Sequence, residues 1–456
     1  MTRPRRLFVT VCACALLGAA APAVAGAAWT APQDLGPTGF GSASTSLASN
    51  DRGDAVTAFS QPGAIRIARA TAGAAFGPSV GVSTDGTVPR VAIDARGVAL
   101  IAWEYQDGAV NGVPDDFRGT TTCCTGTKVI VWRPGQLPTR TRVIRRRGLV
   151  TRLGPVAAIS GRRGLLVQTA SFNRTSGEER GGSLQFAPIR LDGRPGKRRN
   201  VVRSNWVGAS LQFSGGRAVV GLIGQGKGRA STRLALRSQR ASGTFGTIRV
   251  FRTVPEKLEA HGGSTEFADI VMAPDGRGGQ LVVMQRGRRP KQFVQFVRKP
   301  RTGRLRSITV RRGPAEDFRF SRPAASPDGW SAVAFARLPR ITELGGVGYV
   351  LAVSPNGRSF VTRVTASDPL SGPAVSVTRG GTGAAGFIDG RNVPFGASVT
   401  RASFVPLTRG LPRLPAALII DRADVGIENV VMTSNRRDRA RVVWEEGGRV
   451  LASRLG

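Results

Sequence analysis

The side chains most able to do chemistry in this sequence are carboxylates in its longer loops, a single histidine and one pair of adjacent cysteines. One tryptophan, Trp206, also lies in a connecting segment. Acids, an imidazole and an indole can together hold a polar ligand, a sugar or a peptide through hydrogen bonds and stacking. The predicted ligand-binding residues are Glu104, Asp107, Asp115, Asp116, Trp206 and His261.

The paired cysteines, Cys123 and Cys124, lie in the longest insertion of the chain. Adjacent Cα atoms across a trans peptide are about 3.8 Å apart, below the usual disulfide range. Oxidation would therefore close a strained ring that stiffens the loop, and an oxidising compartment would permit it. The sequence leaves both redox states open.

Some short motifs in this sequence resemble catalytic sites, but the residues and elements around them do not support that chemistry. His261 is the only histidine, which excludes most zinc arrangements and leaves a hydrolase triad dependent on one residue. The string 77–81 matches a nucleophile elbow, but that motif needs a strand, a turn and a helix, and we expect an outer strand at 76–82 here. The string 221–227 resembles a phosphate loop but lacks the required Ser or Thr. We predict no catalytic residue, no metal site and no cofactor.

A sequence pattern that repeats eight times indicates the strands that position these residues. It consists of an apolar run, a polar turn and, six residues after a fixed turn position, a side chain that is usually large. The turn positions are Gly53, Gly97, Gly164, Gly216, Gly278, Gly329, Gly381 and Asp438. The positions six residues later are Phe59, Trp103, Ala170, Leu222, Met284, Phe335, Phe387 and Trp444, of which only Ala170 is small. Repetition every 45 to 65 residues or so, with four short strands per unit, predicts an all-β protein, a single β-propeller. We expect eight blades, with seven as the alternative, and large side chains buried between them.

The second unit shows the expected strands most clearly, at 90–94, 98–103, 128–133 and 139–144. The eighth unit has room for only three strands. We expect segment 29–35 to supply the fourth, so that N- and C-terminal strands pair, close the ring and remove exposed sheet edges. With the first strand of each blade innermost, the loops from strand two to three and the connections between blades emerge together. This end, which holds most of the 29 acids, is called the loop-rich face.

These units resemble secreted bacterial β-propeller repeat proteins and, more distantly, the sialidase superfamily. Residues 49–53 match the first half of the sialidase box, but the sequence departs from it at Asp54 and the turn joins the first two strands. A sialidase also needs a tyrosine nucleophile with a glutamate partner. Glu104 adjoins Tyr105, yet neighbouring strand residues point to opposite faces. The resemblance therefore implies a fold and no catalytic residue.

The first 27 residues read as a cleaved signal peptide, since arginines precede an apolar stretch at 7–21 and small residues at 23–25. Arg5 and Arg6 also suit a twin-arginine signal, so both export routes stay open. No later stretch approaches the roughly 20 apolar residues of a membrane span. We expect one propeller domain at 28–456, monomeric and secreted or associated with the cell envelope.

The net charge of the chain indicates which kinds of partner it would attract. The chain has 66 Lys and Arg against 29 Asp and Glu, giving a formal net charge of +37. Such a surface attracts anionic polymers in a salt-dependent way. Aromatic residues make up only 6%, so we do not expect nucleic acid as the partner. We predict a non-catalytic binding or scaffolding module for anionic envelope polymers, glycans or proteins. The alternative is a glycan-active hydrolase or lyase, which would need two carboxylates about 5 to 10 Å apart on the loop-rich face.

Overall fold

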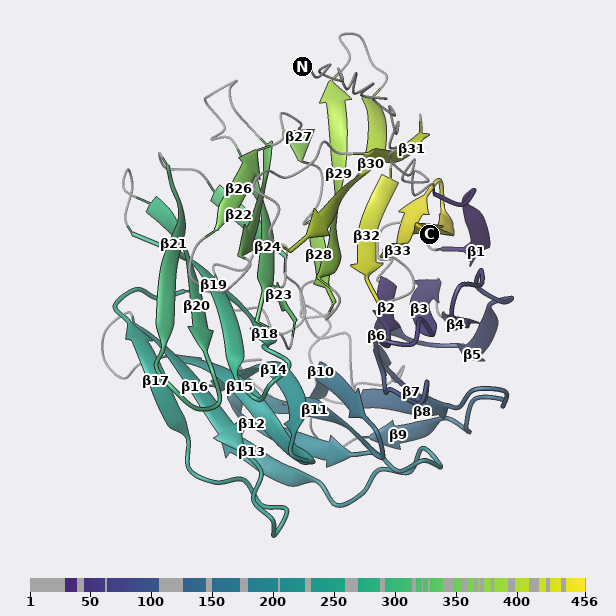
Figure 1. The fold of residues 1–456 in the computed structure, drawn as a ribbon. Helices are drawn as coiled ribbons and strands as arrows, with labels where there is room; N and C mark the ends of the chain where they lie inside the picture. Colours follow the sequence, from purple (N-terminus) through teal and green to yellow (C-terminus); the bar gives the residue numbers. More distant parts are fainter. Residues whose placement is uncertain are drawn as a thin grey trace, which may run out of the picture.

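The protein is an all-β propeller of eight blades (Figure 1). The computed structural model describes residues 29–38, 45–61, 64–105, 126–144, 150–172, 179–203, 206–225, 231–258, 270–287, 292–313, 317–321, 323–326, 329–338, 348–354, 360–364, 368–369, 373–378, 381–392, 398–409, 418–423, 427–435 and 440–455. All regular elements there are strands. The described residues include no helix long and apolar enough to cross a membrane.

Each blade is an antiparallel meander of four main strands. Blades 1 to 4 comprise β2 (Thr45–Ser49), β3 (Ala55–Gln61), β4 (Ala64–Ala70), β5 (Val80–Ser83); β6 (Thr87–Ile93), β7 (Ala99–Tyr105), β8 (Gly126–Trp132), β9 (Arg142–Ile144); β10 (Val150–Ile159), β11 (Arg162–Phe172), β12 (Glu179–Pro188), β13 (Arg199–Arg203); and β14 (Trp206–Ser214), β15 (Arg217–Gln225), β16 (Thr232–Ser238), β17 (Arg249–Val254). Blades 5 to 8 comprise β18 (Ile270–Pro274), β19 (Gln280–Arg286), β20 (Gln292–Lys299), β21 (Arg306–Gly313); β22 (Asp317–Phe320), β23 (Ala324–Ala325), β24 (Ser331–Leu338), β25 (Gly348–Ser354), β26 (Val361–Val364); β27 (Asp368–Pro369), β28 (Ala374–Val377), β29 (Thr382–Asn392), β30 (Ser398–Thr408), β31 (Leu418–Ala423); and β32 (Ile427–Thr433), β33 (Ala440–Glu446), β34 (Arg449–Leu455), β1 (Gln33–Pro37).

In blades 1, 2 and 5 the turn between the first two strands is built by an Asx residue and a glycine. Asp94 Oδ1 accepts hydrogen bonds from the backbone N–H groups of Arg96 and Val98, both at 2.9 Å. Asn50 and Asp275 occupy the same position and accept from the second and fourth residues that follow them. The turn glycine has a φ of 81° at Gly97, a region that favours glycine. The glycines at six of the predicted turn positions have positive φ and thus a conformational cause. Gly164 is the exception, because the turn of blade 3 is made at Gly161, with a φ of 78°, and Gly164 lies inside β11 opposite Ala157.

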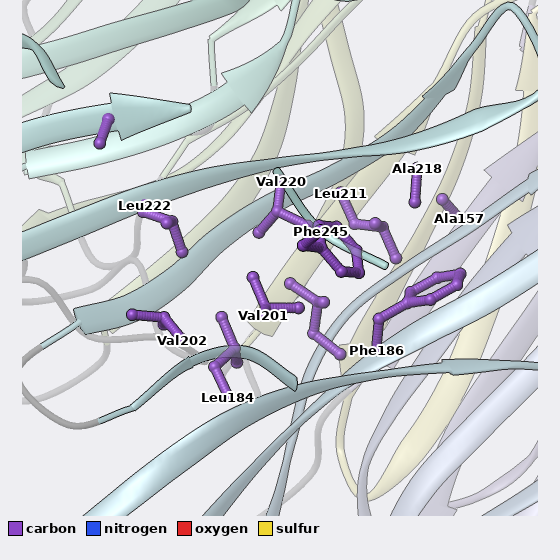
Figure 2. Packing of buried hydrophobic residues seen from close by; sticks show 12 residues of the cluster. Ala157, Leu184, Phe186, Val201, Val202, Leu211, Ala218, Val220, Leu222 and Phe245 are labelled. Atoms are coloured by element: carbon purple, nitrogen blue, oxygen red, sulfur yellow. The ribbon is translucent and has the colours of Figure 1, made fainter. Parts of the chain in front are cut away.

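The side chains six residues after these turns form the core, as predicted. Phe59, Trp103, Leu222, Met284, Phe335 and Trp444 are fully buried, and Phe387 is 3% exposed. The side chain of Ala170 lies outside the described residues. Eight apolar clusters fill the eight gaps between neighbouring blades. Figure 2 shows the one between blades 3 and 4, where Leu184 and Phe186 face Val220 and Leu222.

The ring is closed by the pairing of β1 with β34, which confirms the predicted use of the N-terminal segment. The regular strand begins at Gln33, later than expected, and Trp29 makes an isolated bridge to Leu455. Pro32 stands between them and has no N–H to donate to a ladder. The first strands pack side by side around the ring, β2 lying next to both β6 and β32.

Prolines also explain where strands are shorter or broken. The outer strand expected at 76–82 is regular only from Val80, since Pro78 cannot donate a hydrogen bond. The first strands of blades 6 and 7 are split into two pieces, with Pro323 and Pro373 at the breaks. Pro89 and Pro155 sit at register shifts in β6 and β10. These strands pair on one side only, so a missing N–H costs little there.

The two strings that mimic catalytic motifs are structural here. Ser79 Oγ donates to the carbonyl of Leu35 at 2.5 Å and accepts from Arg66 Nε at 2.9 Å, which ties β1 to blade 1. Gly221 and Gly224 lie within strand β15, not at the start of a helix. Where the structure describes these strings, they contain no helix of the kind that their chemistry would require.

Candidate ligand-binding site

Glu104 and Trp206 are the two predicted ligand-binding residues within the described residues, and both lie at the loop-rich face. Glu104 is at the end of β7, paired with Thr87 at the start of β6. Trp206 begins β14. Asp107, Asp115, Asp116, His261, Cys123 and Cys124 lie outside the described residues. The structure therefore places two of the six predicted ligand-binding residues and leaves the cysteine pair untested.

Glu104 makes a contact between blades. Its Oε1 accepts a hydrogen bond of 2.6 Å from the backbone N–H of Leu153, at the register shift of β10 in blade 3. The pair Trp103-Glu104 recurs as Trp444-Glu445, and Glu445 Oε1 accepts from Thr45 Oγ1 of blade 1 at 2.6 Å. Both glutamates thus hold the first strand of the next blade. One oxygen of Glu104 has a structural function that sequence reasoning missed.

Trp206 belongs to blade 4 and packs against the side of blade 3 that is opposite to Glu104. Its ring adjoins the apolar cluster between blades 3 and 4. The guanidinium carbon of Arg233 lies 5.0 Å from the ring centroid, a cation–π contact. A side chain at Gly224 would collide with the indole, so this glycine allows the ring its place. Glu104 and Trp206 therefore flank blade 3 at the same end of the molecule.

A polar cluster fixes the base of the long insertion between β7 and β8. Lys128 Nζ lies 2.6 Å from both carboxylate oxygens of Asp85, and Ser83 Oγ donates to Asp85 Oδ1 at 2.6 Å. Lys128 Nζ is also 4.6 Å from the centroid of the buried Tyr105 ring. Burial opposes ionisation of Asp85, but the hydrogen bonds from Lys128 and Ser83 outweigh it and hold its pKa below the ordinary value.

The backbone beside this cluster is strained. Val88 has a φ of 48° and is the one non-glycine residue with positive φ in the described part of the chain. It precedes Pro89, at the register shift of β6. Two residues earlier, a side chain at Gly86 would collide with Trp103. Strain of this kind persists only where the surroundings impose it, and it concentrates at binding and catalytic sites.

Replacing Asp85 with asparagine is expected to destabilise the protein at pH 7 and to matter less in acid. Because the folded-state pKa is depressed, the carboxylate's stabilisation is present above the unfolded value of about 3.9 and is lost as the pH falls through the lower folded value. Its side chain is 37% exposed, so the effect should not exceed ~1 kcal/mol. Melting temperatures of D85N and the parent at pH 7 and below pH 4 measure it. If the difference in melting temperature between D85N and the parent were the same in acid, the assignment would be contradicted. The control is D51N, which alters an exposed aspartate.

A second cluster on the loop-rich face joins blades 4 and 5. Glu256 forms an ion pair with Arg286 at 3.3 Å, and Gln295 Oε1 accepts from Arg252 at 2.8 Å. Burial, and then the positive charge of Arg286, lower the pKa of Arg252, while Glu256 opposes the shift. Thr232 Oγ1 donates to the Glu256 carbonyl at 2.8 Å. These contacts fasten the chain as it leaves β17.

Five carboxylates of this face have side chains that the structure describes, and all five are built into the scaffold. Asp85 and Glu256 are paired with cations, Glu104 and Glu445 accept hydrogen bonds from the next blade, and Glu446 accepts from Trp444 Nε1. A general acid for glycoside cleavage needs a raised pKa, whereas that of Asp85 is lowered. Within the described ranges, no three His, Cys, Asp or Glu residues form a potential metal site.

No family model and no curated protein matches the chain. Among solved structures, an ulvan lyase of polysaccharide lyase family PL25 matches with a TM-score of 0.45 and 10% identity, covering 93% of this chain and 95% of that one. Prolyl oligopeptidase B from Galerina marginata gives 0.47 and 9%, covering 89% of this chain and 55% of its own. A puromycin-hydrolyzing peptidase of Mycobacterium tuberculosis gives 0.43 and 13%, covering 84% and 53%. At these TM-scores and identities, no activity of a matched protein can be assigned to this chain. Its own sheets show that it is an eight-bladed β-propeller.

Proposed function

We propose that this propeller is an exported, non-catalytic binding or scaffolding module of the cell exterior. Its ligands are polar or anionic polymers, glycans or proteins of the cell envelope, taken at the loop-rich face. The observation that carries the proposal is that the carboxylates whose side chains are described there serve the scaffold through ion pairs and hydrogen bonds. Carboxylates used in this way support binding better than proton transfer.

The insertion between β7 and β8 is the part of the face best suited to recognition. Its base is fixed by the Asp85–Lys128 pair, and Gly126 lies so close to Tyr105 that a side chain would collide with the ring. A scaffold dictates strands more strictly than loops, so added loop length is where specificity is usually built. We propose that Asp107, Asp115, Asp116, His261 and Trp206 contact the ligand.

Export and location rest on the signal-like sequence of the first 27 residues, which precede the described part. The resemblance to secreted bacterial propeller repeat proteins supports the same placement. In this setting Cys123 and Cys124 would meet oxidising conditions that permit a disulfide. We propose that the mature protein, from residue 28, acts as a monomer.

Replacing residues 107–125 with a short Gly-Ser linker is expected to abolish ligand binding and leave the fold intact. The flanking strands keep their partners, and Gly126 is retained for its packing on Tyr105. Mature protein and the variant would be compared on an array of glycans, cell-wall polymers and envelope proteins. The matched control replaces residues 226–230, between β15 and β16 at the same face, with Gly-Ser of equal length. Binding retained by a folded 107–125 variant would refute the assignment of the insertion.

A further inference from the structure

The end of the propeller opposite the loop-rich face carries a band of positive charge across blades 3 to 5. It is formed by the turns between first and second strands, the turns between third and fourth strands, and the adjoining strand ends. The following exposed or half-exposed residues make up this basic surface: Arg162, Arg190, Arg194, Lys197, Arg198, Arg199, Arg217, Arg240, Arg249, Arg277, Lys299, Arg301, Arg304 and Arg306. In the described part of these turns, Asp192 is the one exposed carboxylate, since Asp275 is 1% exposed.

The basic surface is continuous from blade to blade. The guanidinium of Arg162 in blade 3 lies against Gly216 in blade 4. Arg199 in blade 3 approaches Gly243, also in blade 4. Arg301 Nη1 in blade 5 donates to Ser214 Oγ in blade 4 at 3.2 Å. Figure 1 shows the three blades side by side. The contacts between blades join their turns into one surface.

Two further arginines of this end, Arg237 and Arg298, are partly buried. Burial, and then the charge of Arg240, lower the pKa of Arg237, whose Nε donates to the Gly246 carbonyl at 2.5 Å. Burial also lowers the pKa of Arg298, with Asp275 opposing and nearby arginines adding to the shift. Like charges held together destabilise the compact state, and a bound anion relieves that repulsion.

We propose that the basic surface binds a linear acidic polysaccharide whose carboxylate or sulfate groups lie along the three blades. Guanidinium groups pair with such oxyanions through two parallel hydrogen bonds, and 60 of the chain's 66 basic residues are arginine. Single-stranded nucleic acid would need exposed aromatic rings for stacking, and the large hydrophobic residues exposed in the described chain include none. The inference relies on the proposed function only for the extracellular setting. With a second ligand at the loop-rich face, the protein would bridge two envelope components.

The test removes three charges from the basic surface and, separately, three charges elsewhere. The variant R240Q/R277Q/R304Q alters exposed residues of blades 4 and 5. The matched control R96Q/R203Q/K257Q alters exposed cations outside the basic surface and lowers the net charge equally. Polygalacturonate is titrated into each mature protein over a range of NaCl concentrations, with neutral dextran as the uncharged comparator. We expect the surface variant to bind about tenfold or more weakly with a shallower salt dependence, and the control to change less than about twofold.

Three results would overturn the proposal: equal losses in the two triples, no polygalacturonate binding by the parent, or tighter binding of a poly-thymidine oligonucleotide of equal charge at the same salt. A second triple, R190Q/R249Q/R306Q, repeats the test at other positions of the basic surface in case the first variant fails to fold. The 107–125 replacement should still bind polygalacturonate. Loss of array binding alone therefore bears on the loop-rich face, and loss of polygalacturonate binding alone bears on the basic surface.

Discussion

Replacing Trp103 with alanine should lower the free energy of unfolding by about 3 to 5 kcal/mol, as truncation of a large core side chain does. The indole is fully buried between blades 1 and 2, in a cluster with Ile65 and Ile101. Gly86 lies against the ring, so the backbone is shaped around it and cannot collapse easily into the cavity. Far-ultraviolet circular dichroism during urea unfolding would show the loss as a lower midpoint.

The matched control for Trp103→Ala is Leu137→Ala. Leu137 is 87% exposed, and a surface truncation of this kind changes stability by no more than about 0.5 kcal/mol. Phe387→Ala, at the equivalent position of blade 7, should resemble Trp103→Ala because its ring is 3% exposed. If both core variants unfolded at the parent midpoint, the repeat register would be wrong.

Deleting residues 28–37 should lower the melting temperature by several degrees or cause aggregation. The deletion removes β1, leaves the outer edge of β34 unpaired and takes Leu35 from the cluster between blades 8 and 1. It also removes the two hydrogen bonds between the Gln33 side chain and the Phe76 backbone. An unpaired edge is a template for association with other chains.

The control for this deletion is a chain that begins at residue 28, which lacks only the segment before the described structure. Differential scanning calorimetry and size-exclusion chromatography would compare the two proteins. The closed ring predicts a lower melting temperature, or soluble oligomers, for the shorter chain alone. Identical melting curves and elution volumes would remove closure by β1 as a source of stability.

The fold could be predicted because the repeat fixes the turn and the core position together. Gly97 and Trp103 illustrate this, since the glycine adopts positive φ and the indole six residues later is buried. Strand ends were predicted less well. Propensity alone extended the outer strand of blade 1 back to residue 76, whereas the N–H missing at Pro78 leaves Phe76 with one isolated bridge to Ala70.

The candidate site could be predicted only as an end of the propeller. Glu104 was expected to face a ligand, but its bond to Leu153 depends on a register shift in the next blade that sequence does not reveal. One signal was available, because the recurrence of Trp103-Glu104 at Trp444-Glu445 pointed to a shared structural function. The pair of Asp85 and Lys128 joins residues far apart in sequence, so the pairing required the structure.

The central claim is that the loop-rich face binds a ligand without changing it. The most direct measurement incubates mature protein with each ligand found on the array and follows the ligand by mass spectrometry and by assays for new reducing ends and unsaturated sugars. Saturable binding with unchanged ligand mass is the predicted result. Cleavage products that accumulate with time and disappear in the 107–125 variant would contradict the claim and establish the hydrolase or lyase alternative.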